Sequence, residues 1–277
     1  MQSNGYAYPD HLAPSLEGMP DQPGVYTFHA GSDRLPLYIG KSVTLRSRVR
    51  AHLRNPAEAP MLRQATHITY IRTAGDIGAQ LLEAQRIKQL QPLYNHKLRR
   101  VRQLCAITLS DTGTPQIVAS KNIDFANPGL LQLHGLFSSQ RAAVQTLHRL
   151  ADEHGLCLCL LGLERLQSGR PCFRHMVRKC WGACCGQESK QDHDQRLRLA
   201  LEQLRVATWP LSGAMGLIED SGDMHQIHVV RNWCYLGSAA NAREAKRLAK
   251  AAPGFDVDGY KILVGPVLRQ SVKAIAL

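Results

Sequence analysis

The hydrophobic pattern of residues 24–53 changes once, from the alternation typical of β-strands to the spacing of an α-helix. This strand–strand–helix order limits the fold more than any other feature of the chain. "GVYTFHA" (24–30) alternates apolar and polar residues as a strand does, and "LPLYIGKS" (35–42) predicts a second strand. The turn-forming "GSDR" between them favours a hairpin. From Thr44 onward, Leu45, Val49 and Leu53 recur at helical spacing. This part of the chain is therefore expected to be α+β.

The next segments complete a first domain over residues 18–100, a small antiparallel sheet with flanking helices. "HITYIRT" (67–73) predicts a third strand, and "GDIGAQLLEAQRIKQLQ" (75–91) predicts a second helix that Pro92 ends. A connecting α+β region over residues 101–156 follows. It contains a hairpin from "CAITLS" and "PQIVAS" and a helix over 140–154, which Ser138 or Ser139 begins and Gly155 ends.

The remaining sequence divides into a cysteine-rich segment, 157–186, and a small C-terminal α+β region, 187–277. We expect the latter to begin with the helix "DHDQRLRLALEQLRVA" and to continue as β-β-α-β. The four elements are "AMGLIED", "HQIHVVRNWCYLG", "NAREAKRLAKAA" and "YKILVGPVL". Its role is open, although the basic "AREAKRLAK" suggests contact with DNA or a protein partner.

The net charge of +12 favours a polyanionic partner. No apolar run approaches the roughly 20 residues that span a bilayer. The first residues, "MQSNGYAYPDHLAP", lack the basic and apolar parts of a signal peptide. We therefore expect a cytoplasmic protein without a membrane partner, in which nucleic acid is the polyanion. In that compartment the eight cysteines are thiols or metal ligands rather than disulfides.

Glu83 is the first candidate for a functional residue. On a helix it shares a face with Ala79, Ile87 and Leu90, which should meet the sheet. A carboxylate turned toward a core needs a partner. Either it pairs with an arginine in the core, or it binds a cation, because Mg²⁺ is often held by one carboxylate with waters and a phosphate.

Cations surround the second predicted strand. "GKS" (40–42) is not a phosphate-binding P-loop, because that motif needs glycine at position 35, which is leucine. Arg48 and His52 are one helical turn apart, on the edge of the first helix rather than on its buried stripe. Together with Lys41 they can face a phosphodiester.

These residues carry a resemblance. "GVY" (24–26), "YIG" (38–40), Arg48, Glu83 and Asn95 resemble the complete motif of GIY-YIG nucleases. "LLEAQRIKQLQPLYN" is similar to the N-terminal half of the UvrC family of excision-repair nucleases, and the resemblance extends over about residues 18–185.

The resemblance implies phosphodiester hydrolysis with a single divalent metal. Glu83 would hold Mg²⁺ or Mn²⁺, and Tyr38 would help to activate water, with Tyr26 nearby. Arg48 would stabilise charge on the phosphate. The other implied site residues are Lys41, His52 and Asn95, which would bind or orient around the phosphate. Arg46 and Arg50 on the same helix are predicted DNA contacts.

The cysteine-rich segment predicts a second site. Cys159, Cys172, Cys180 and Cys184 lack the C-x2-C pairs of zinc knuckles, and four thiolates also suit an iron–sulfur cluster. Buried thiols without a metal are the plain alternative. The resemblance implies a [4Fe–4S] cluster, with zinc as the alternative and with Cys157 and Cys185 as neighbouring candidate ligands. Cations and an aromatic residue interleave the cysteines and predict a DNA contact: Arg170, Arg174, Arg178, Lys179 and Trp181.

The family implies a function in nucleotide excision repair. Full-length members continue into a UvrB-binding helical hairpin, a second nuclease and helix-hairpin-helix modules, for which the residues after Cys185 are too few. The resemblance thus points to a short member with one nuclease centre, acting as a monomer on damaged double-stranded DNA. It would cut 3′ of the lesion in a complex prepared by UvrA and UvrB. The alternatives are a non-catalytic DNA-binding module and a free-standing homing or restriction nuclease.

Overall fold

The predicted hairpin forms, and its first strand is the centre of a three-stranded antiparallel sheet. The computed structural model describes residues 7–31, 35–95, 104–119, 132–165, 170–251 and 254–277. Strand order is β2-β1-β3, and a bulge interrupts the β1–β2 pairing at Phe28 and His29. The strands are β1 (Gly24–Ala30), β2 (Leu35–Ser42) and β3 (His67–Arg72). The three strands confirm the predicted first sheet.

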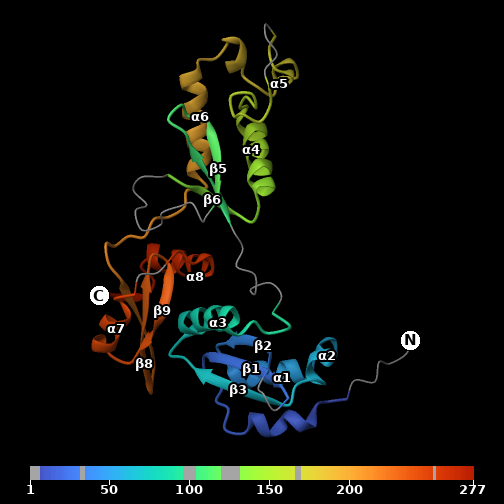
Figure 1. Ribbon diagram of the computed structural model, residues 1–277, viewed down its shortest axis with the longest axis vertical. Helices are drawn as coiled ribbons and strands as arrows, with labels where there is room; N and C mark the ends of the chain where they lie inside the picture. Colours follow the sequence, from blue (N-terminus) through green and yellow to red (C-terminus); the bar gives the residue numbers. More distant parts are fainter. Residues whose placement is uncertain (1–6, 32–34, 96–103, 120–131, 166–169, 252–253) are drawn as a thin grey trace. The chain divides into compact units, whose positions relative to one another are not determined.

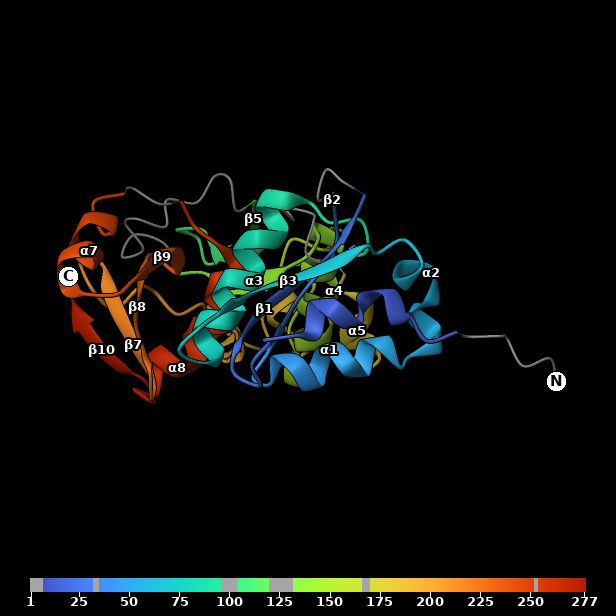
Figure 2. The same ribbon diagram turned by 90° about the horizontal axis from the view of Figure 1, so that it is seen from below.

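Helices cover both faces of this sheet. Tyr26 and Phe28 point to the face on which α1 packs through Leu45 and Val49. Val25, one residue out of phase with Tyr26, packs on the other face against α3. Figures 1 and 2 both show α3 running beside the sheet. The helical elements of this domain are η1 (Asp10–Leu16), α1 (Leu45–Leu53), η2 (Pro56–Glu58), α2 (Ala59–Leu62) and α3 (Asp76–Leu90).

Two glycines of the sheet are required by space rather than by backbone conformation. A Cβ on Gly24 would lie 2.3 Å from the carbonyl oxygen of Ile71, and a Cβ on Gly40 would lie 2.3 Å from the hydroxyl of Tyr26. Gly40 is also the β2 partner of Tyr26 in the ladder. A larger residue at position 40 would therefore push the Tyr26 ring out of its place.

The C-terminal residues form a four-stranded antiparallel sheet of order β10-β7-β8-β9, with two helices. The prediction for this region was partly wrong. Residues 260–268 form most of a helix instead of the last strand, and the predicted long strand over 225–237 is a hairpin that turns at Asn232 and Trp233, both with positive φ. The elements are β7 (Met215–Ser221), β8 (Met224–Arg231), β9 (Cys234–Ala239), α7 (Ala242–Leu248), α8 (Val257–Leu268) and β10 (Lys273–Ala276).

Residues between these two parts form a unit of their own. Its sheet has the order β5-β4-β6, and α4 begins at the predicted cap, where the Ser139 side chain accepts from the amide of Ala142. Gly155 ends α4 in the left-handed conformation, at φ 61°. The elements are β4 (Cys105–Leu109), β5 (Pro115–Ala119), β6 (His134–Phe137), α4 (Gln140–His154), α5 (Phe173–Met176), η5 (Ala183–Cys185) and α6 (Lys190–Glu202).

The units divide the chain differently from the four predicted regions. Met1–Val101 and Trp209–Leu277 cluster as one unit, and Arg102–Thr208 form the other. Helix α6, predicted to begin the C-terminal region, packs through Leu197 and Leu201 on Leu147 and Leu150 of α4. Because α6 completes that core, the predicted boundary at 186/187 falls inside the second unit.

Candidate active site

Three aromatic side chains of the predicted site lie together on the α1 side of the first sheet. The Tyr26 hydroxyl and His52 Nε2 form a hydrogen bond of 2.6 Å. The Tyr38 ring centroid lies 5.5 Å from that of His52 and 6.2 Å from that of Tyr26. His52 is only 5% exposed, so its predicted position on the edge of α1 was wrong. It is a core histidine whose ring orients a phenol.

Glu58 fixes the other side of the His52 ring. Its Oε2 is hydrogen-bonded to His52 Nδ1, and its Oε1 accepts from the side-chain amide of Asn55. A carboxylate on one imidazole nitrogen sets the tautomer, so that the opposite nitrogen faces Tyr26 in a defined state. Glu58 was missed in the sequence, since it lies outside α1 and shares no periodic face with His52.

Glu83 reaches the YIG strand from α3. Its Oε1 accepts a 3.0 Å hydrogen bond from the main-chain amide of Lys41. Burial raises the pKa of Glu83, Lys41 opposes this rise, and Asp76 adds to it. Within the described residues Glu83 forms no ion pair with arginine or lysine, which argues against the buried Glu–Arg alternative. A half-buried carboxylate with one oxygen on a backbone amide fits a divalent cation completed by waters and phosphate.

Lys41 is held by a residue that the sequence did not point to. Its Nζ donates to Asp76 Oδ1 at 2.8 Å, while Asp76 Oδ2 accepts from Gln80 at 2.7 Å. Asp76 lies two helical turns before Glu83 on α3 and could have been found by that spacing. The Lys41–Asp76 pair therefore ties β2 to the first turn of α3.

The predicted guanidinium, Arg48, is exposed at this site. A hydrogen bond to Tyr26 raises the pKa of Arg48. Burial raises the pKa of Tyr26, and burial together with the charge of Glu83 raises that of Tyr38. Both phenols therefore keep their protons at neutral pH as hydrogen-bond donors unless a positive charge offsets Glu83.

Asn95 is a positioning residue for β2. Its Oδ1 accepts from the amide of Ile39, and its Nδ2 donates to the carbonyl of Ile39, both at 2.8 Å. Ile39 stands between Tyr38 and Gly40, so the Asn95 side chain acts like a short neighbouring strand at the YIG segment. Of the two predicted DNA contacts on α1, Arg46 is half-buried and donates to the carbonyl of Met19, whereas Arg50 is exposed.

The second site is a cluster of four cysteines, but with a different first member. Ligand atoms of Cys157, Cys172, Cys180 and Cys184 all lie within 4.8 Å of one another. Cys157, the alternative candidate, takes the place expected for Cys159 in this group, because the turn after α4 buries Cys157 completely and leaves Cys159 at the rim. The backbone amide of Cys157 donates to the buried His193, at 3.1 Å from Nε2, and this bond fixes the turn.

The cysteine geometry fits a metal centre. Cys157 Sγ and Cys172 Sγ are 4.0 Å apart. Four thiolates around one zinc, each at about 2.3 Å, would be roughly 3.8 Å apart. The sulfur separations, 4.8 Å at most, are closer to those around one tetrahedral ion, whereas a four-iron cluster would require the sulfurs to move outward. Backbone amides already point at two of them, from Cys172 to Cys184 Sγ and from Gly182 to Cys180 Sγ, both at 3.4 Å.

The cations around this cluster are not equivalent. Arg174 was predicted to contact DNA, but it is 12% exposed and pairs with Asp152 at 2.8 Å, so it braces the segment onto α4. The Trp181 ring is exposed, and the guanidinium of Arg196 lies 3.9 Å from its centroid. Three predicted cations remain exposed: Arg170, Arg178 and Lys179. Phe173 and Met176 on α5 are also exposed, at 68% and 64%, and were not predicted.

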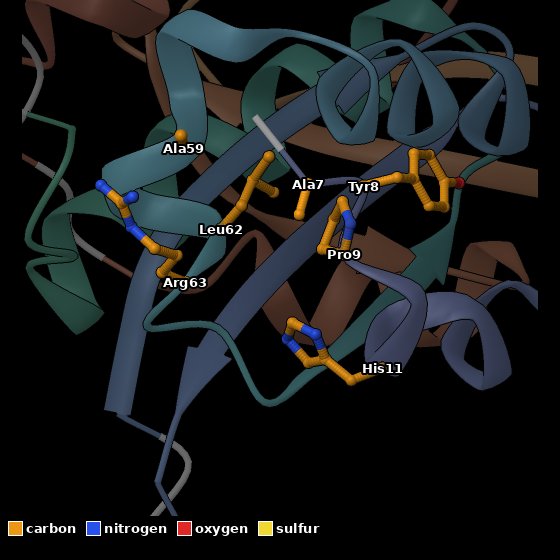
Figure 3. Close-up of a pocket in the computed structure, with 7 residues that line it drawn as sticks. All are labelled: Ala7, Tyr8, Pro9, His11, Ala59, Leu62 and Arg63. Carbon is orange, nitrogen blue, oxygen red and sulfur yellow. The ribbon is translucent and has the colours of Figure 1, made fainter. Parts of the chain in front are cut away.

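A small pocket of about 230 Å³ lies in the first unit (Figure 3). Residues at η1 and α2 line it, including Tyr8, His11 and Arg63. None of the predicted catalytic residues contributes to this lining.

In the described part of the chain, every helix is too short or too polar to cross a membrane.

Three family models match the chain in sequence order. Residues 22–96 match the UvrC-like GIY-YIG domain, residues 104–203 the middle domain of the UvrC/Cho excinucleases, and residues 214–277 the C-terminal domain of excinuclease Cho. The last two matches agree with the structural division, because α6 falls in the middle domain.

Two relatives named excinuclease Cho match nearly the whole chain. The excinuclease Cho of Escherichia coli K12 is 52% identical over 263 residues, which are 95% of this chain and 88% of the relative. The Salmonella typhi excinuclease Cho is 51% identical over 98% of this chain and 92% of its own length. The magnesium-bound N-terminal endonuclease domain of UvrC from Thermotoga maritima is 30% identical over 30% of this chain and 93% of that domain, with a TM-score of 0.28. The extent and identity of the Cho matches make this chain a member of the Cho family of UvrC-like excinucleases, endonucleases of nucleotide excision repair.

Proposed function

We propose that the protein cuts the damaged DNA strand on the 3′ side of a lesion, in a complex with UvrB that UvrA has loaded. The supporting observation is the meeting of Glu83 with the YIG strand, next to two phenols and an exposed arginine. A site that only binds DNA has no use for a half-buried carboxylate, because the phosphate backbone repels it.

The side chains divide the work of hydrolysis. Glu83 would hold Mg²⁺ or Mn²⁺, which would supply positive charge for the phosphate and would offset the charge of Glu83 that, after burial, raises the pKa of Tyr38. Tyr38 would orient the attacking water through its hydroxyl. Only after its own proton has passed to solvent, which the positive charge beside Glu83 would favour, could the phenolate oxygen accept the proton of that water. The exposed guanidinium of Arg48 stabilises charge on the phosphate oxygens.

The buried residues keep these groups in place. His52 and Glu58 fix the Tyr26 hydroxyl, which in turn directs Arg48. The Lys41 ammonium, held by Asp76, stays near the strand end where it adds positive charge for a phosphate. Asn95 keeps the YIG segment in register.

The second unit contributes DNA contacts around a structural metal centre. Cys157, Cys172, Cys180 and Cys184 hold a metal that stiffens the segment. The family resemblance supports a [4Fe–4S] cluster, and the sulfur spacing supports zinc. The phosphate backbone of the DNA is contacted by the exposed cations Arg170, Arg178 and Lys179. Trp181 contacts a base or sugar of the DNA.

The function is tested with an end-labelled duplex carrying one bulky lesion. The substrate is incubated with UvrA and UvrB, UvrA is removed, and this protein is added with Mg²⁺ or Mn²⁺. We expect a single cut 3′ of the lesion that requires UvrB and metal. Cutting of undamaged DNA without partners would support a free-standing nuclease, and stable binding without any cut would support a non-catalytic module.

A further inference from the structure

The helix that carries Glu83 begins without a cap of its own. Its N-cap residue, Gly75, has no side chain, yet two amides of the first turn donate to a side chain from elsewhere in the chain. Glu219 of β7 accepts from the amide of Ile77 at 3.0 Å through Oε1 and from that of Gly78 at 2.8 Å through Oε2. A carboxylate from the C-terminal domain therefore occupies the position that an N-cap side chain fills in most helices.

Glu219 is held in this position by a buried chain of hydrogen bonds. Its Oε2 is 2.9 Å from Nε2 of His228, a side chain with no exposed surface. His228 Nδ1 lies 2.6 Å from Ser238 Oγ, which lies 2.6 Å from the hydroxyl of Tyr235. Burial alone would raise the pKa of Glu219. The hydrogen bonds with His228 and with the two amides outweigh burial, so the pKa is lowered. Glu219 is thus a fixed anion at the helix N-terminus.

The sequence of α3 leaves room for this contact. A Cβ on Gly75 would lie 2.3 Å from Glu219 Oε1, and one on Gly78 would lie 2.4 Å from His228 Cε1. Neither glycine has a positive φ, the backbone conformation that most often requires glycine. Gly78 stands in the first turn of a helix, where glycine is unfavourable. Both glycines are therefore explained by the close approach of the C-terminal domain.

Further contacts join the C-terminal domain to this part of the chain. Lys88, near the end of α3, pairs with Asp256 and with Asp258, the latter at 2.8 Å. Gln226 accepts from the amide of Ala74, just before α3. Figure 1 shows α3 with β2 on one side and α8 and β9 on the other, and α3 contacts all three elements.

We propose that the C-terminal domain positions the catalytic carboxylate, and that Glu219 does so by capping α3. Two parts of the nuclease site depend on that first turn and its helix: Asp76, which holds Lys41, and Glu83 two turns further on. A frayed first turn would release Lys41 and let Glu83 move from β2. The proposal rests on the proposed function of Glu83 as metal ligand, and makes Glu219 a positioning residue.

A double-mutant cycle tests it. Glu219→Ala removes the cap and also clears the space next to position 75. Gly75→Ser alone collides with the carboxylate of Glu219. In the double variant, the hydroxyl of the introduced serine can accept from the first-turn amides in place of Glu219. The extended backbone at position 75 (φ −166°) admits any residue. The control is Asp223→Asn, which breaks the exposed pair with Arg72 in the same interface without touching α3.

Two readouts are measured on the full chain: the Mn²⁺ concentration for half-maximal incision, and hydrogen exchange of a peptide covering residues 75–82. Each single variant should need about 2- to 30-fold more Mn²⁺, the range that corresponds to a lost N-cap. Exchange over the first turn should become faster in Glu219→Ala. The double variant should return to within about twofold of the parent, and Asp223→Asn should match the parent in both readouts.

The outcomes separate this inference from the proposed function. Unchanged metal requirement in Glu219→Ala, or a double variant worse than both single ones, would overturn the positioning role. Unchanged exchange over residues 75–82 would overturn the cap itself. If the parent protein does not cut at all, the proposed function fails, and hydrogen exchange still decides whether Glu219 caps α3. Glu219→Gln, which keeps the shape of the side chain but only one acceptor oxygen, repeats the comparison should Glu219→Ala fold poorly.

Discussion

The main-chain amide of Lys41 donates to Glu83 Oε1 at 3.0 Å, so the YIG strand and helix α3 meet directly at the carboxylate that we propose as metal ligand. A side chain bonded to a backbone amide depends on both elements for its position. The two elements are secured separately, β2 by Asn95 and α3 by Glu219. This relation makes residues outside the immediate site important for incision.

Asn95 offers the first test of that dependence. Asn95→Ala removes two hydrogen bonds to Ile39, and we expect a loss of about 1–3 kcal/mol in the free energy of unfolding with slower incision. Asn95→Asp should be worse, because a carboxylate cannot donate to the carbonyl of Ile39. Urea unfolding and single-turnover cutting measure both effects. Equal stability of the aspartate variant and the parent would contradict this role of Asn95.

The two phenols should respond differently to loss of their hydroxyls. Tyr26→Phe leaves His52 Nε2 buried without its partner, so we expect about 1–3 kcal/mol less stability as well as slower cutting. Tyr38 is half-buried, so Tyr38→Phe should slow the chemical step and leave the unfolding midpoint nearly unchanged. Thermal unfolding and single-turnover rates separate the two cases. A destabilised Tyr38→Phe with normal chemistry would reverse the assignment.

Much of this site could be predicted from the sequence, because its residues lie on strongly patterned elements. The strands over 24–30 and 35–42 have the predicted bounds, and Glu83 meets the sheet as the periodicity of α3 indicates. His52 was harder, because its burial depends on Tyr26 and Glu58, which come from other parts of the chain. Spacing alone reports positions along a helix and not which polar groups will satisfy a buried ring.

The C-terminal region was harder to predict for a related reason. "YKILVGPVL" is apolar and β-branched enough for a strand, yet it forms most of α8, which packs against α3. Such a choice between strand and helix is made by tertiary contacts. The cap of α3 by Glu219 joins residues more than a hundred positions apart, and no local pattern indicates it.

The cysteine cluster yields a direct comparison of two neighbouring residues. Cys157→Ser should lose the bound metal and destabilise the second unit, because Cys157 Sγ lies within 4.8 Å of the ligand atoms of the other three. Cys159→Ser should retain the metal. Metal content after anaerobic purification gives the stoichiometry, and a brown colour that fades on oxidation distinguishes iron–sulfur from zinc. Metal loss in Cys159→Ser alone would restore the ligand set expected from the sequence.

Glu219 predicts a pH dependence of stability. Because its folded-state pKa is lowered, its contribution is fully present above the unfolded-state pKa of about 4.3 and is lost as the pH falls through the lower folded value. The difference in free energy of unfolding between the parent and Glu219→Gln should therefore be fully present at about pH 5 and shrink in more acidic solution. Urea titrations below pH 5 measure it. A difference that grows as the pH falls below about 4 would contradict the lowered pKa.

Incision by Glu83→Gln across a Mn²⁺ titration measures whether Glu83 holds the metal of a nuclease centre. Glu17→Gln, at an exposed carboxylate of the same structural unit, is the matched control. On lesion-containing duplex loaded with UvrB, we expect Glu83→Gln to cut about 10²–10³ times more slowly, with DNA affinity retained and the control unaffected. Cutting by Glu83→Gln at the parent rate and the parent Mn²⁺ requirement would contradict it.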